Sequence, residues 1–486
     1  MPPSPQPTRL RPLSHIERYS STRHPLGIYR CVVFTCRYQL ASPLTRPQLY
    51  AALASVVRAH PTLRVGILGQ STNSPAFSHV PELDLRNHVA FCSVDDAASV
   101  GEYEDAVADK QGWRHDLLWQ NIETQPPWQL IVVRPPQGLF PAYHEDLLFG
   151  YHHSIADGTS GKVFHEHLLA ALNTPLDSSH EEASRLLSFP DPPLLPEAQQ
   201  DVIPYRNTLP FILDTLWHGL APSWLHFPKP CIWYSRNIDF SLPYKTRVLP
   251  VDVAPSVLSS LITASRNNST SLTGLLHALT LVSLSLRLPP DEAPAFVADT
   301  PINSRRYVGP AADPSLLSTL RVLISGTSHT HPPPEVSSVR NAHADLDGII
   351  WTIARRVKNE LAATMSRLPV NDPISGLDYI SDWFQYWRKK DGHPRDSSWE
   401  ISNIGVLTGD PLSQSSIAAI TRIIFTNGSM VAGPPIGLGV GSVSGGGLNI
   451  GISWQQNAVS EALIKGLAGD LASYIDAFHE TGKFKS

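Results

Sequence analysis

The first half of the chain alternates apolar, strand-like runs with runs of helical periodicity. Residues 28–40 and 129–134 are rich in β-branched and aromatic side chains, which favours strands. Between Pro47 and Pro61, leucine and valine recur at i, i+4, i+7 and i+8, which predicts an amphipathic helix. A third apolar run at 146–153 predicts a strand that pairs with 129–134. A second helical stripe follows this run, formed by Phe164, Leu168, Ala171 and Leu172.

The second half resumes this mixture after a proline-rich stretch. We expect helices at 255–266, 271–288 and 347–366, and strands near 294–300, 401–407, 422–426 and 447–454. The stretch 328–345 contains consecutive prolines and is expected to be a loop.

Strands and helices are mixed in both halves, so the predicted fold class is α/β (α+β), with two lobes that each hold a mixed β-sheet and flanking helices. A chain of 486 residues is too long for one ordinary hydrophobic core. We expect an N-terminal lobe at 1–185, a crossover linker at 186–240, where prolines remove backbone donors, and a C-terminal lobe at 241–486.

Composition narrows the choice of partners and compartment. The net charge of −5 and the absence of a long basic stripe argue against nucleic acid. The four cysteines lack the spacing of a zinc site or a disulfide framework, and the first residues lack the apolar core of a signal peptide. The longest apolar run, from Leu275, is too short and too serine-rich to span a membrane. We expect a cytoplasmic monomer.

The stretch GYHHSIADGTSG at 150–161 carries the candidate chemistry. His153 ends an apolar strand, and Asp157 with Gly158 is expected to form a turn in which the glycine can take a positive φ. Two interpretations stay open on the residues alone: a hydrogen-bonded hairpin histidine, or a general base aimed at a substrate hydroxyl. His152 should point to the opposite face of the strand and be structural.

The same spacing recurs once more, at His343, Asp347 and Gly348. There the histidine follows the proline-rich stretch, and Asp347 stands where the next helix needs an N-cap. We therefore expect His343 to be structural.

The stretch YHHSIADGTSG resembles the HHxxxDG core of CoA-dependent acyltransferases with the chloramphenicol-acetyltransferase-like fold, which include plant BAHD acyltransferases and condensation domains. The whole chain is most similar to the fungal alcohol O-acetyltransferase family. The stretches that carry this likeness are LSHIERYSSTRHPLGIYRCVVF, RAHPTLRVGI, DTPINSRRYVG, IIWTIARRVKNELA, the run 376–405 and LNIGISWQQNAVS. The DFGWG motif of the plant relatives is absent, and residues 439–451 occupy the comparable region.

The resemblance implies an O-acyltransferase that moves an acetyl or other short acyl group from acyl-CoA, a co-substrate, to a small-molecule alcohol. His153 would act as the general base in a ternary complex, and Asp157 would hold the loop by pairing with Arg305 or Arg306. Ser402 or Asn403 would stabilise the oxyanion. The alternative within the fold is a condensation-type enzyme that uses a carrier-protein donor to form an amide or to cyclise a substrate.

Three further groups of residues are expected to be structural. Trp383 and Trp387 stand at i, i+4 and predict core packing. The apolar segment 209–227 is expected to pack between the lobes, with the lining of an acceptor or acyl tunnel and peripheral membrane contact as the alternatives. His329 and His331 lack carboxylates or thiolates at ligand spacing, so no metal site is expected.

Overall fold

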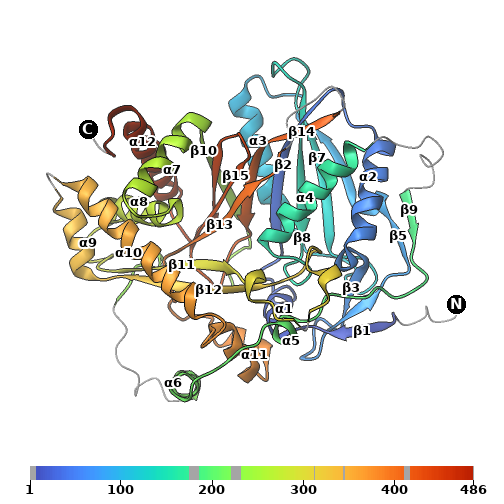
Figure 1. Cartoon of the computed structure of the whole chain (residues 1–486), viewed down its shortest axis with the longest axis horizontal. Coiled ribbons are helices and arrows are strands. Elements are labelled where there is room, and N and C mark those ends of the chain that lie inside the picture. Colours follow the sequence, from blue (N-terminus) through green and yellow to red (C-terminus); the bar gives the residue numbers. More distant parts are fainter. Residues whose placement is uncertain are drawn as a thin grey trace.

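Two mixed β-sheets stand side by side at the centre of the molecule, and helices cover them (Figure 1). The computed structural model describes residues 7–174, 185–220, 231–310, 312–342, 345–409 and 416–484. Its mixed α/β architecture with two lobes agrees with the fold class expected from the sequence.

The first sheet has the strand order β14-β2-β8-β7-β6, in which only β6 and β7 are parallel. Its central strand β8 is buried along its whole length, including the three polar residues at its start, and its second half is the apolar part of the run predicted from the sequence. The strands are β2 (Val32–Leu40), β6 (Val89–Ser93), β7 (Trp128–Arg134), β8 (His144–Tyr151) and β14 (Ala418–Asn427). Two small sheets flank this lobe: β1 (Arg9–Pro12), β4 (Ala76–His79) and β3 (Val65–Leu68), and β5 (Glu82–Asp84) with β9 (Leu186–Ser188).

The second sheet has the order β10-β16-β15-β13-β11-β12, with parallel pairing in its middle. Its strands are β10 (Thr246–Val253), β11 (Phe296–Asn303), β12 (Ile324–His331), β13 (Trp399–Leu407), β15 (Ile436–Val443) and β16 (Leu448–Gln455).

Helices pack on both sheets, and each lobe has its own large hydrophobic core. Those of the first lobe are α1 (His15–Ser21), α2 (Arg46–Ala59), α3 (Val100–Asp116) and α4 (Gly158–Leu172). The connecting region contains α5 (Gln199–Val202) and α6 (Leu209–Leu220). The second lobe has α7 (Pro255–Asn267), α8 (Leu272–Arg287), α9 (Pro333–Arg340), α10 (Leu346–Arg367), α11 (Trp383–Arg388) and α12 (Glu461–Thr481).

One strand departs from the predicted domain boundaries. β14 comes from the C-terminal half of the chain but pairs with β2 along its length, so it completes the sheet of the first lobe (Figure 1). β14 therefore belongs to the first sheet, although it lies within the stretch 241–486 expected to form the C-terminal lobe.

Two expectations for residues 328–348 were wrong. The stretch 328–345 is not one loop, because it contains the end of β12 and the helix α9, which begins at the consecutive prolines. Asp345, not Asp347, is the N-cap of α10, and its side chain accepts a hydrogen bond from the Gly348 N–H at 3.0 Å.

The apolar segment 209–227 also differs from its expectation as far as it is described. Its first part forms α6, on which Leu209, Leu213 and Trp217 are 67%, 57% and 49% exposed and do not pack between the lobes. The rest of the segment, from residue 221, lies outside the described residues. Trp383 and Trp387 are buried, as their spacing predicts.

Among the described helices, none is individually long and apolar enough to cross a membrane. Only α7 and α8 taken together pass that test, and they meet at an angle of 98°.

Candidate active site

The loop between β8 and α4 holds the histidines and the aspartate of the motif. β8 ends at Tyr151, so His152 and His153 lie just beyond the strand. Asp157 is the N-cap of α4, where its Oδ1 accepts from the Ser160 N–H at 2.8 Å. A buried strand thus fixes one end of the loop and a capped helix fixes the other.

Gly158 serves a different purpose from the one expected. It is the first residue of α4 and does not have a positive φ. A Cβ placed there would lie 3.0 Å from the Phe425 ring and 3.2 Å from the Ile404 side chain. The glycine is therefore needed because β13 and β14 approach the start of α4 closely.

The His153 imidazole has one nitrogen fixed and one left open. Its Nδ1 lies 3.0 Å from the Ala156 carbonyl oxygen, which can only accept, so Nδ1 carries the hydrogen of the neutral ring. No hydrogen bond to Nε2 is found within the described part of the chain. The side chain keeps partial exposure, although Ser154, Ile155 and Ala156 beside it are buried. Nε2 is therefore the basic nitrogen, and it has no hydrogen-bond partner among the described residues.

The surroundings of His153 keep its ring neutral at pH 7. Desolvation by the surrounding protein, followed by the Arg23 cation, lowers the pKa of His153 to about 4. The Asp157 carboxylate acts in the opposite direction but does not prevail. The ring of Tyr29 lies against His153, with centroids 6.0 Å apart.

His152 points elsewhere and is fully engaged. Its Nδ1 accepts from the Ser154 N–H at 3.1 Å, and its Nε2 lies 3.2 Å from the Gln70 amide nitrogen. Burial lowers its pKa well below the ordinary value. These contacts support the structural interpretation of His152.

Arg305, and not Arg306, lies against Asp157. Its Nη1 donates to Asp157 Oδ2 at 2.8 Å and its Nη2 donates to Oδ1 at 3.0 Å. The Leu323 N–H also donates to Oδ2, at 3.0 Å. Burial by itself would raise the pKa of Asp157, but the Arg305 guanidinium holds it below the usual value. Because Arg305 follows β11, this bidentate pair fastens the motif loop of the first lobe to the second lobe.

The two oxyanion candidates face different sides of β13. The amide of Asn403 donates to Thr273 Oγ1 at 3.0 Å and accepts from the Gly405 N–H at 2.9 Å, so its polar atoms are occupied locally. Ser402 alternates with Asn403 and shares its face with Ile404, which reaches toward Gly158. No hydrogen bond of its hydroxyl is found among the described residues, so Ser402 is the better placed of the two.

Comparison with known proteins shows which family the chain belongs to. A profile described as "Alcohol acetyltransferase" matches residues 118–465, well over half of the chain. The chain belongs to the alcohol acetyltransferase family. It is therefore an acyltransferase, and the likeness to fungal alcohol O-acetyltransferases expected from the sequence is confirmed.

The similarity to relatives and to solved structures covers almost the full length of this chain. It is 23% identical to the "Probable alcohol acetyltransferase FCK4" of Fusarium pseudograminearum, over 96% of this chain and 95% of that one. It is 24% identical to the "Probable alcohol acetyltransferase crmB" of Aspergillus fumigatus, over 95% and 98%. The structure of TRI3 trichothecene 15-O-acetyltransferase from Fusarium sporotrichioides is similar in fold, with a TM-score of 0.73, 11% identity, and coverage of 97% and 95%. A condensation domain of the calcium-dependent antibiotic synthetase has the same fold, with a TM-score of 0.59, 13% identity, and coverage of 98% and 97%.

Sequence reasoning missed a hydrogen-bonded chain beside His153. The Tyr29 hydroxyl donates to Asn427 Oδ1 at 3.0 Å, and Asn427 Nδ2 donates to Glu400 Oε1 at 3.0 Å. Burial, followed by the Asp299 carboxylate on the next strand, raises the pKa of Glu400 to about 7. A carboxylate between the apolar residues Trp399 and Ile401, at the start of β13, was the signal that could have pointed to it.

The two histidines of β12, which lie outside the motif, have structural partners. His343 lies outside the described residues. His329 and His331 are buried side chains of the edge strand β12, where they bind Glu360 at 2.7 Å and Glu335 at 2.6 Å. Among the described residues, no group of three or more His, Cys, Asp or Glu side chains could hold a metal ion.

Proposed function

We propose that this protein transfers an acetyl group from acetyl-CoA to the hydroxyl of a small-molecule alcohol, with His153 as the general base. The observation that carries this proposal is the state of His153: Nδ1 is held by the Ala156 carbonyl, and Nε2 is free in a partly exposed side chain. Membership of the alcohol acetyltransferase family supports the acetyl group and the alcohol acceptor.

The chemistry needs one base and no covalent enzyme intermediate. Nε2 takes the proton of the acceptor hydroxyl while its oxygen forms a bond to the thioester carbonyl carbon. When the tetrahedral intermediate collapses, the carbon–sulfur bond breaks and the same proton passes to the CoA sulfur. The products are an ester and CoA, and proximity in the ternary complex supplies much of the acceleration.

Two other elements support this reaction. The Asp157–Arg305 pair holds the loop so that Nε2 stays aimed at the acceptor, which makes both of them positioning residues. The Ser402 hydroxyl would donate to the oxyanion of the tetrahedral intermediate.

The donor and the acceptor can be tested together. Purified protein should release CoA thiol from acetyl-CoA only when an alcohol is present, and the ester should appear in equal amount. Transfer from an acyl group on a carrier protein, without transfer from acetyl-CoA, would contradict the proposal and favour the condensation-type alternative. Gel filtration and fractionation would test the accompanying proposal of a cytoplasmic monomer.

A further inference from the structure

Arg114 is a buried cation near the C-terminal end of α3. Its side chain is 2% exposed, and its Nε is buried without any hydrogen-bond partner. Nη1 makes one long contact, 3.5 Å to the Leu117 carbonyl oxygen. An arginine so deep in a protein normally has a carboxylate or several carbonyl groups around it.

The charge of Arg114 is not balanced by its neighbours. The nearby groups Cys31, His24 and His115 are neutral at pH 7, because burial raises the pKa of Cys31 to about 11 and lowers those of His24 to about 4 and His115 to about 3. Asp116 instead accepts from the Thr246 N–H at 2.7 Å and pairs with Lys245 at 3.4 Å. No salt bridge to Arg114 is found in the described ranges.

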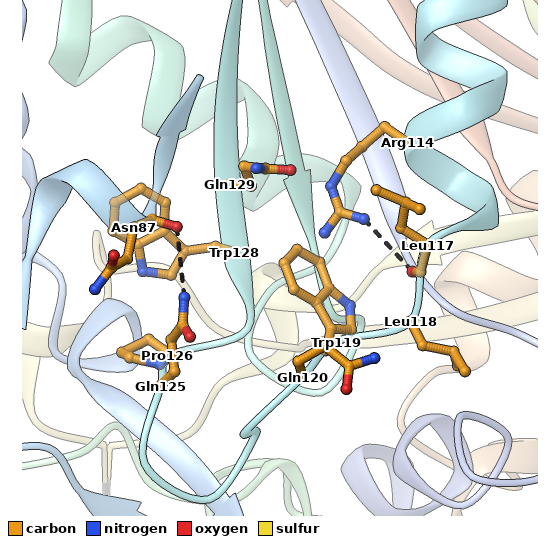
Figure 2. A pocket seen from close by; sticks show the side chains of 10 residues that line it. All are labelled: Asn87, Arg114, Leu117, Leu118, Trp119, Gln120, Gln125, Pro126, Trp128 and Gln129. Carbon is orange, nitrogen blue, oxygen red and sulfur yellow. Dashed lines mark hydrogen bonds between the residues drawn. The ribbon is translucent and has the colours of Figure 1, made fainter.

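The guanidinium borders a small cavity of about 160 Å³. Figure 2 shows the Arg114 side chain extending from α3 toward Gln129, with the Trp119 ring beside it and Trp128 on the other side of the cavity. The guanidinium carbon lies 3.7 Å from the centre of the Trp119 ring. Gly150 of β8 makes room for the arginine, since a Cβ there would lie 3.0 Å from its Nε.

We propose that this cavity binds a small organic carboxylate. The carboxylate would accept hydrogen bonds from the Arg114 guanidinium and balance its charge. The carbon skeleton would lie against Trp119, Trp128 and Pro126, and the amide of Gln129 can donate to a remaining oxygen. The cavity is smaller than the roughly 300 to 1,000 Å³ typical of drug-sized ligands, so it suits a molecule of a few carbons. None of these residues belongs to the site proposed for acetyl transfer, so the inference stands apart from it.

Calorimetric titration of the wild-type protein tests the site directly. Butyrate at constant ionic strength should give a saturable heat with one site per chain, and inorganic phosphate should bind at least tenfold more weakly because it lacks an apolar part. Absence of a saturable butyrate signal would overturn the site. Equal binding of phosphate would overturn the carboxylate class.

Thermal denaturation of Arg114→Met gives a second test, in which the variant gains stability but loses the response to butyrate. Without added anion this variant should melt higher than wild type, because it removes an unbalanced buried charge. Saturating butyrate should raise the melting temperature of wild type by about 1 to 3 °C and leave R114M unchanged. Arg58→Met, at an exposed position on α2, should respond to butyrate as wild type does. An equal butyrate response in R114M would contradict the assignment, and the calorimetric result stands even if R114M does not fold.

Discussion

The state of the His153 ring depends on neighbours that lie far apart in the sequence. The Ala156 carbonyl fixes the position of the hydrogen on the ring, and desolvation together with Arg23 keeps the ring neutral. The HHxxxDG spacing indicated which histidine to consider. It could not indicate the pKa, because Arg23 comes from the segment after α1, about 130 residues earlier in the chain. It also left open which of Arg305 and Arg306 pairs with Asp157, since that depends on how the chain turns after β11.

The depressed pKa of His153 predicts where activity falls with pH. In the proposed mechanism the neutral ring is the active form, so kcat/KM should stay level between pH 8 and 6 and fall as the pH drops through about 4. Initial rates measured at each pH soon after acidification would locate this fall in the pH–rate profile. Activity should return at pH 7, which confirms that the acid exposure is reversible. Glu400→Gln should not move the fall. A fall near pH 6.5 would show that desolvation does not act on the catalytic base.

Replacement of Arg305 by lysine tests the positioning pair. Lysine keeps the charge but cannot make two parallel hydrogen bonds to Asp157, so R305K should lose roughly 1–3 kcal/mol of unfolding free energy. Activity should fall because the loop carrying His153 loosens. The matched change Arg306→Lys should cost less than about 0.5 kcal/mol. Equal losses in denaturant titrations of the two variants would contradict the role given to Arg305.

At the scale of elements, periodicity predicted the longer helices α2, α4, α7, α8 and α10 and seven strands, but it gave no expectation for others such as α3, α12 and β15. Two of the missed elements have local causes. β12 was missed because its alternating serine, threonine and histidine do not resemble a strand, although its partner β11 and the helix α10 bury one face. α9 was hidden by prolines that stand at the start of a helix, where they are tolerated. The exposed apolar stripe of α6 has helical spacing, which cannot tell an exposed face from a packed one.

The glycines of β15 allow β14 to cross it closely, and they provide a test. A Cβ at Gly439 would overlap the carbonyl oxygen of Phe425 on β14. Gly439→Ala should therefore destabilise the protein by roughly 3 kcal/mol or more, as measured by chemical denaturation. Gly469→Ala, on an exposed turn of α12 with open space around it, should instead stabilise by about 0.5–1 kcal/mol. Tolerance of G439A would show that β14 does not pack on β15 as described.

For the whole molecule, the sequence predicted two mixed α/β lobes but not the strand that links them. Pairing of β14 with β2 joins segments almost 400 residues apart, and no local pattern specifies such a partner. The same pairing places Asn427, at the end of β14, beside Tyr29 and Glu400. The site is therefore a product of the association of the two halves.

Buried histidines throughout the molecule predict instability in acid. Burial lowers the pKa values of His24, His60, His88, His115 and His165 to about 3 or 4, whereas an unfolded histidine titrates near 6.5. Below pH 6.5 the unfolded chain binds more protons than the folded chain, so the unfolding free energy should fall steadily from pH 6.5 to 4. Asp116, Glu145, Asp299, Asp372 and Glu400, whose pKa values are raised, act in the opposite direction. They are outnumbered, because burial also lowers the pKa values of His144, His152 and His277. A melting temperature unchanged between pH 7.5 and 5 would contradict this.

The most direct test of the central claim compares the two histidines that share the same spacing. CoA release from acetyl-CoA in the presence of an alcohol should fall at least a hundredfold in His153→Ala, with the melting temperature near that of wild type. His343→Ala should retain nearly full activity. Comparable activity in the two variants, whether both active or both inactive, would contradict the assignment of His153 as the base.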